Sequence, residues 1–284
     1  MNIRILDNFY QTSSFFPMPV VLISTIAESG QVNLGPYSLC FPHVVSEDHS
    51  MVLCCRSNSN TAQNIRRTEV CSINFIPFDK KYLKNCVQLG YPGDTTEEKM
   101  KSSKFTLIPS QRNQEEKKQG VQYPDIVKEA FQVFECTVND NYPIYENEET
   151  LETHFILKLD KIILKKKWQE CLLKGKGFPT LPIDYGFRDN VNFWFCKHSE
   201  PYNEKMPKEK GTSINTVMYA ARRTDPDIEW TEEACAKLVK VPRIFLKTAI
   251  KGCIEKAKEE GITVMTAEFM EKIRDKRSKE KQKR

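Results

Sequence analysis

Short apolar runs separated by turn residues dominate the first 165 positions of the chain. Residues 19–27 form an apolar, β-branched run that ends at Glu28-Ser29-Gly30, a sequence typical of a hairpin turn. Residues 131–138 alternate apolar and polar side chains, as a half-buried strand does. The pattern predicts strands over 19–27, 31–39, 51–56, 70–76, 131–138 and 154–164.

Two helical patterns interrupt these strands. The first covers 61–67, with Asn58 or Asn60 as its N-cap, and the second covers 80–89. Residues 110–124 are polar and predict a surface loop or a short exposed helix. Many strands with few helices favour a small barrel decorated by helices, so we expect a mainly β fold of the α+β class.

The composition changes to helix formers at Trp230. Thr231 is the expected N-cap of a helix that Pro242 ends, and Pro242 then opens a second helix at its first position. Thr266 is expected to cap a last helix. These helices predict an all-α module of about 50 residues, near the lower size limit for folding alone. We therefore divide the chain into 1–228 and 229–284.

Residues 170–229 are the part of the chain whose pattern is hardest to interpret. They hold Gly and Pro, an aromatic cluster at 193–195 and a basic loop near 205–211. None of these features predicts a particular element, so the sequence assigns this segment no function.

The net charge of +5 comes from the C-terminal tail. Residues 271–284 carry eight Lys or Arg and three Asp or Glu, while the other 270 residues hold 35 basic and 35 acidic side chains. Because these 270 residues are formally neutral, the composition does not favour nucleic-acid binding. No run approaches the roughly 18 apolar residues of a membrane span, and the N-terminus lacks a secretory pattern, so we expect a cytoplasmic protein.

The ten cysteines form no CxxC pair. Cys40-x-x-His43 and Cys196-x-His198 come nearest to ligand spacing, but neither has a second half, so we predict no metal site. Several cysteines lie in apolar runs, where a free thiol packs as a small hydrophobe. Cys54-Cys55 is a vicinal pair, which leaves open the hypothesis of a redox-sensing disulfide.

Two blocks of the sequence carry the candidate chemistry. The first is residues 17–25 followed by Asn33-Leu34-Gly35-Pro36-Tyr37-Ser38, and the second is residues 56–65, with Thr61-x-x-Asn64-Ile65, before the strand at 70–76. In this order they resemble the flavin reductase-like FMN-binding family, whose fold is a split β-barrel. The resemblance covers about residues 10–170. The Lys or Asp that many relatives place just before the Thr is absent here.

The resemblance implies an FMN site, and the residue types agree with it. A phosphate dianion prefers backbone N–H groups, hydroxyls and a guanidinium at the start of a helix, and residues 56–61 supply these. Residues 35–40 can present backbone groups to the edge of the flavin ring. The FMN-binding residues that the resemblance implies are Ser24, Thr25, Asn33, Ser38, Arg56, Ser57, Thr61 and Asn64.

The expected function is a flavin-dependent oxidoreductase that transfers hydride or electrons through FMN, which carries the reactive chemistry itself. The resemblance also implies a homodimer with FMN near the subunit interface. No G-x-G-x-x-G signature is present, so NAD(P)H, if it is the reductant, would stack transiently on the flavin. We name no catalytic acid or base; His154 is the best polar candidate, and a structural role competes with it.

Two alternatives remain open at this point. The first is an FMN electron carrier that docks a redox protein, and the second is a flavin-free binding or assembly protein. The extra C-terminal helices favour the carrier. Residues 230–273 resemble the small C-terminal domain of a subunit of light-independent protochlorophyllide reductase. A generic three-helix appendage explains these helices equally well.

Overall fold

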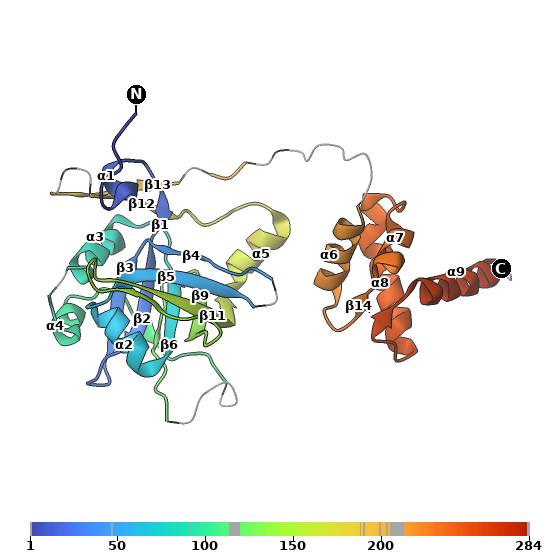
Figure 1. Ribbon diagram of the computed structural model, residues 1–284, viewed down its shortest axis with the longest axis horizontal. Helices are drawn as coiled ribbons and strands as arrows, with labels where there is room; N and C mark the ends of the chain where they lie inside the picture. Colours follow the sequence, from blue (N-terminus) through green and yellow to red (C-terminus); the bar gives the residue numbers. More distant parts are fainter. Residues whose placement is uncertain are drawn as a thin grey trace. The chain divides into compact units, whose positions relative to one another are not determined.

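A computed structural model describes residues 2–46, 48–91, 93–113, 120–187, 189, 191–198, 200–202, 204 and 213–282. Its contacts divide the chain into two compact units, Met1–Tyr202 and Asn203–Arg284 (Figure 1). The basic loop predicted near 205–211 lies outside the described residues.

One antiparallel sheet builds the first unit, with strand order β3-β2-β6-β9-β11-β5-β4 and β10 beside β11. Its strands are β2 (Val21–Ile26), β3 (Val32–Tyr37), β4 (Cys40–Pro42), β5 (Ser50–Arg56), β6 (Val70–Phe75), β9 (Gln132–Val138), β10 (Tyr145–Asn147) and β11 (Glu152–Leu164).

The long strand β11 curls this sheet into a half-barrel. Its first half, Glu152–Lys158, pairs with β5, and its second half, Leu157–Leu164, pairs with β9. The register with β9 shifts between Leu159 and Lys161, and a bulge of this kind bends a strand. The predicted α+β fold, a split β-barrel followed by helices, is confirmed (Figure 1).

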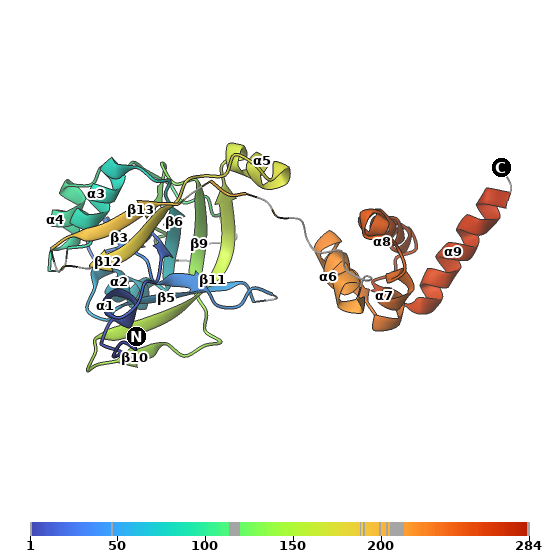
Figure 2. The same ribbon diagram turned by 90° about the horizontal axis from the view of Figure 1, so that it is seen from above.

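Short elements surround the sheet. Helices α2, α3 and α4 each contact β3, and β12 lies between β1 and β13 in a small second sheet. Figure 2 shows β12 beside β13. These elements are α1 (Phe9–Thr12), α2 (Asn60–Thr68), α3 (Lys80–Leu89), α4 (Thr96–Lys101), α5 (Lys166–Lys174), β1 (Met18–Pro19), β7 (Leu107–Ile108), β8 (Ile126–Val127), β12 (Pro182–Phe187) and β13 (Phe193–Lys197).

Both faces of the sheet are covered around β2 and β6. On the concave face, Phe155 and Ile73 pack with Ala62 and Ile65 of α2. On the other face, Leu22 packs with apolar residues of α3. All of β2 is therefore buried, which explains why its sequence is a continuous apolar run rather than an alternating one.

The predicted strands and the helices at 61–67 and 80–89 are confirmed, but one cap differs. The N-cap of α2 is Ser59, whose hydroxyl accepts the backbone N–H of Ala62 at 3.2 Å. Asn60, one of the two predicted caps, is the first helical residue, and its amide donates to the carbonyl of Asp94 at 3.1 Å. Asn58, the other, precedes the cap. A Ser accepts the N3 amide as well as Asn does, so residue type alone did not decide the cap.

The second unit is helical. It holds α6 (Ile214–Thr224), β14 (Glu229–Trp230), α7 (Glu232–Leu238), α8 (Arg243–Glu259), β15 (Val264–Met265) and α9 (Ala267–Gln282). Thr231 caps α7 as predicted, whereas Pro242 is the N-cap of α8 and not its first residue. Val217 and Ala221 of α6 belong to the hydrophobic core of this unit. Helix α6 is therefore part of the helical module, which we expected from the sequence to begin only at residue 229.

Within the described residues, none of the helices combines the length and the apolarity that a membrane crossing requires.

Candidate functional site

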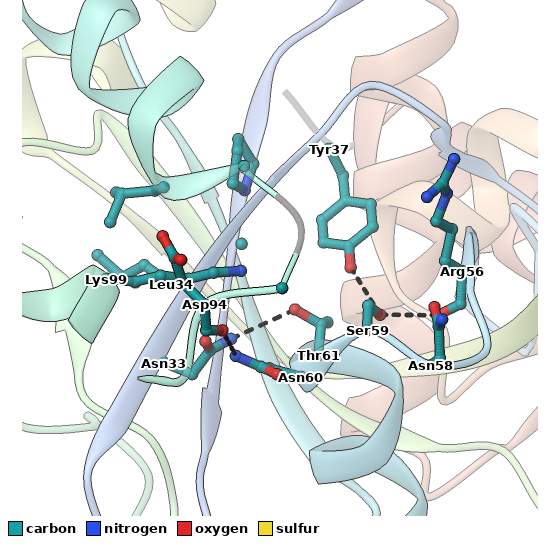
Figure 3. A pocket seen from close by; sticks show the side chains of 15 residues that line it. Asn33, Leu34, Tyr37, Arg56, Asn58, Ser59, Asn60, Thr61, Asp94 and Lys99 are labelled. Atoms are coloured by element: carbon teal, nitrogen blue, oxygen red, sulfur yellow. Dashed lines mark hydrogen bonds between the residues drawn. The ribbon is translucent and has the colours of Figure 1, made fainter. Parts of the chain in front are cut away.

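A pocket of about 360 Å³ opens in the first unit where α2 begins beside β3 (Figure 3). Strand β3, the end of β5, the start of α2, the end of α3 and helix α4 with the residues before it all contribute to its lining. The lining residues are Asn33, Leu34, Gly35, Pro36, Tyr37, Arg56, Asn58, Ser59, Asn60, Thr61, Leu89, Gly90, Gly93, Asp94 and Lys99.

The close approach of α2 to β3 depends on Gly35. A Cβ atom at this position would lie 2.5 Å from the Thr61 hydroxyl oxygen and 2.8 Å from the Tyr37 ring, distances that Cβ atoms do not tolerate. Glycine therefore allows the first turn of the helix to pack directly on the strand backbone. Residues 58–61, at the N-terminus of α2, line this pocket, and the N-terminus of a helix favours the binding of anions.

Hydroxyl and amide groups form the wall of the pocket. The Asn33 amide donates to the Thr61 hydroxyl at 3.3 Å, and the Tyr37 phenol donates to the Ser59 hydroxyl at 3.2 Å (Figure 3). Burial raises the pKa of Tyr37 to about 12, so its phenol is neutral and remains a donor at physiological pH. Ser59 in turn donates to the Arg56 carbonyl at 2.7 Å.

Two cationic side chains and one carboxylate belong to the lining: Arg56, Lys99 and Asp94. Arg56 ends β5 and is exposed. Lys99 comes from α4. Burial lowers the pKa of its ammonium group, and the negative charge of Asp94 offsets part of this shift. The site thus combines a helix N-terminus, several hydroxyls and two cations, which is a set of groups suited to an anionic oxygen ligand.

The predicted site residues fall into three groups. Asn33, Arg56 and Thr61 line the pocket. Thr25 and Asn64 lie behind it: the Thr25 hydroxyl accepts the Asn33 amide at 3.3 Å and the Asn64 amide at 3.0 Å. These two residues support the wall and do not form it.

The other three predicted residues lie away from the lining. Ser24 points to the opposite face of β2 from Thr25 and accepts the Asn74 amide at 2.9 Å. The Ser38 hydroxyl donates to Asp184 of β12 at 2.5 Å. The backbone of Ser57 is held by Leu151 and by Arg66, whose guanidinium donates to its carbonyl at 2.6 Å.

Comparison with known proteins identifies the first unit. The family model of the flavin reductase-like domain matches residues 13–171, which is more than half of the chain. The chain belongs to the flavin reductase-like family. The match contains β2, β3, β5 and α2–α4, and so contains every residue that lines the pocket.

Solved structures share the fold at low sequence identity. The 2-nitrobenzoate 2-nitroreductase of Pseudomonas fluorescens is 19% identical, with a TM-score of 0.56 over 73% of this chain and 97% of that one. Flavoredoxin of Methanosarcina acetivorans is 17% identical, with a TM-score of 0.53 over 74% and 98%. An FMN-binding protein of Thermus thermophilus is 14% identical, with a TM-score of 0.51 over 72% and 98%. No curated protein matches the sequence.

The family match ends at residue 171, before the helices α6–α9. The resemblance of residues 230–273 to protochlorophyllide reductase finds no support in these comparisons and stays a prediction.

Sequence reasoning missed Lys99 as a pocket residue. The motif at 56–61 lacks the Lys or Asp that the family resemblance led us to expect just before the Thr, and Lys99 of α4 lines the same pocket. The capping box of Thr95 and Glu98, which marks the start of α4, was the available signal for this helix. The signal locates a helix start but does not say which pocket the helix reaches.

His154 and the cysteines have other surroundings. His154 Nε2 lies 2.6 Å from Glu152 Oε1, and its ring lies against Tyr145, with 4.6 Å between the ring centroids. All ten cysteines are free. Cys54 and Cys55 point to opposite faces of β5, so the structure gives no support to a vicinal disulfide. Among the described residues, no group of three or more His, Cys, Asp or Glu could hold a metal ion.

Gly35→Ala tests the packing of α2 on β3. We expect the free energy of unfolding to fall by about 1–3 kcal/mol, because the added methyl group forces Thr61 or Tyr37 to move. Denaturant unfolding followed by circular dichroism measures this change. A stability equal to that of the wild type would mean that α2 can move away from β3 at no cost, and would contradict the proposed role of Gly35.

Proposed function

We propose that this chain binds FMN in the pocket at the start of α2 and acts as a flavin-dependent oxidoreductase. The observation that carries the proposal is the placement of Arg56, Lys99 and the Thr61 hydroxyl around one helix N-terminus, inside the segment that matches the family. The choice of ligand is supported by the FMN-binding protein of Thermus thermophilus, which shares the fold of the first unit.

The residues present fit the phosphate end of FMN. A phosphate dianion accepts hydrogen bonds only, and the pocket offers it two cations, the Thr61 hydroxyl and the N-terminus of a helix. The Asp94 carboxylate also lines the pocket and would repel the phosphate, so we assign it to the sugar side of the ligand, where hydroxyl donors are available.

The segment Gly35-Pro36-Tyr37 would hold the flavin ring. Gly35 brings the strand backbone close to the pocket, and Pro36 and Tyr37 add apolar surface. When bound, FMN supplies the hydride or electron transfer itself. The chain's part is to bind and orient FMN and to exclude water from one face of it.

Reductant, assembly and location are part of the same proposal. NAD(P)H is the proposed donor, a homodimer the proposed assembly and the cytoplasm the proposed compartment. They are supported by the family membership and by the sequence features given above.

The absorption spectrum of the purified protein tests FMN binding. The protein is incubated with excess FMN and separated from free flavin by gel filtration. We expect oxidised flavin bands to elute with the protein, and FMN to be released on heating. Protein that elutes colourless after this treatment would contradict the proposal and favour a flavin-free binding or assembly protein.

Lys99→Met tests the phosphate contact. We expect the dissociation constant for FMN to rise by about 10-fold or more, because a charge-assisted hydrogen bond is lost while the side-chain length is kept. Fluorescence titration of FMN measures it. Lys101→Met is the matched control, since Lys101 ends the same helix and does not line the pocket. Equal affinities for both variants and the wild type would exclude Lys99 as a ligand.

An FMN electron carrier is the second candidate function. The helices α6–α9 lie outside the family match and offer a separate docking element for a redox protein, and a flavoredoxin shares the fold of the first unit.

Steady-state oxidation of NADH and NADPH by the FMN-loaded full chain separates the two functions. Turnover with a flavin or small-molecule acceptor supports the oxidoreductase. A bound flavin that neither nucleotide reduces, but that a reduced ferredoxin-like protein does reduce, supports the carrier.

A further inference from the structure

A buried network of polar side chains lies behind the pocket wall. Its centre is Asn33, which is 2% exposed. The Asn33 amide donates to Thr25 and to Thr61, both at 3.3 Å, and its carbonyl oxygen accepts the Thr96 hydroxyl at 3.2 Å. Both amide hydrogens of Asn33 are therefore committed to protein partners, although the residue lines the pocket.

Thr25 anchors this network from the side that faces away from the ligand. It is fully buried, does not line the pocket, and accepts amide hydrogens from both Asn33 and Asn64. A hydroxyl oxygen has two acceptor positions, and both are occupied here. The nitrogen of Asn33 is thereby directed at the pair of hydroxyls, Thr25 and Thr61.

This bond sets the direction of the Thr61 proton. The Thr61 oxygen accepts from Asn33, so its own proton points away from Asn33, and the contents of the pocket are acceptors within its reach. In a buried site a hydroxyl with a fixed proton direction interacts strongly with an anion, since no reorientation is needed on binding.

We infer that Thr25 and Asn64 are positioning residues, which act through Asn33 to hold the Thr61 hydroxyl as a hydrogen-bond donor. The pocket then binds a phosphate monoester in preference to a neutral alcohol. The preferred ligand is then FMN rather than riboflavin. This inference rests on the proposed function, because it needs the flavin phosphate to lie at the start of α2.

The two flavins separate this role from a merely structural one. FMN and riboflavin share the ring and the sugar chain and differ in the phosphate group. A loss of structure in the pocket weakens the binding of both flavins. A loss of donor orientation at Thr61 weakens the binding of FMN more than that of riboflavin, because charge-assisted hydrogen bonds are about twice as strong as neutral ones.

Thr25→Val, a nearly isosteric change, tests the inference in the full chain. We expect the ratio of the riboflavin to the FMN dissociation constant to fall by about 10-fold, the size of one charge-assisted hydrogen bond. Thr61→Val should lower the ratio similarly. The double variant should be no worse than Thr61→Val alone, because both changes act on one hydrogen bond. Fluorescence titration with each flavin gives the constants.

Three further variants guard against a change in stability alone. Thr25→Ser keeps the hydroxyl and should restore the wild-type ratio, and Asn64→Ala should reproduce part of the loss. Ser24→Ala is the matched control: Ser24 neighbours Thr25, is equally buried, and bonds with Asn74 on the other face of β2. It should leave the ratio unchanged even if the melting temperature falls.

Distinct outcomes contradict the inference and the proposed function. If Thr25→Val weakens FMN and riboflavin equally, or leaves the ratio at its wild-type value, the positioning role is wrong while FMN binding stands. If the wild-type chain binds neither flavin, the proposed function itself is wrong.

Discussion

The packing of the first turn of α2 against β3 is the constraint on which the pocket depends. Gly35 allows the contact because it has no side chain, and the Asn33 amide bonds to Thr61 across it. If α2 moved away from the strand, the hydroxyls, the helix N-terminus and the end of β5 would no longer face one space. The geometry of the pocket therefore follows from a single strand-to-helix approach.

The curled sheet makes this approach possible. Because β11 pairs with β5 along one half and with β9 along the other, the sheet closes around α2, whose Ala62 and Ile65 are fully buried. The apolar side of the helix is thus fixed in the half-barrel core, and its N-terminus is left at the rim. The same helix serves as a core element and as one wall of the pocket.

Polar groups are buried beneath the rim at a cost that hydrogen bonds offset. Thr25, Asn33, Asn64 and Thr96 are all nearly inaccessible to solvent, and each has a partner in the network. A satisfied network of this kind is rigid, since any rotation leaves a buried group without a partner. This rigidity links residues that do not line the pocket to those that do.

The sequence by itself determined the six main strands of the large sheet, several of the helices, the family and two of the segments that line the pocket, because period-2 patterns, turn residues and an ordered motif are local signals. Only the tertiary structure decided which motif residues reach the pocket. Strand alternation turns Ser24 and Thr25 to opposite faces, helix packing leaves Asn64 behind the wall, and α4 carries Lys99 to it from a distant part of the chain. Such placements depend on how separate elements meet, and no local pattern records that.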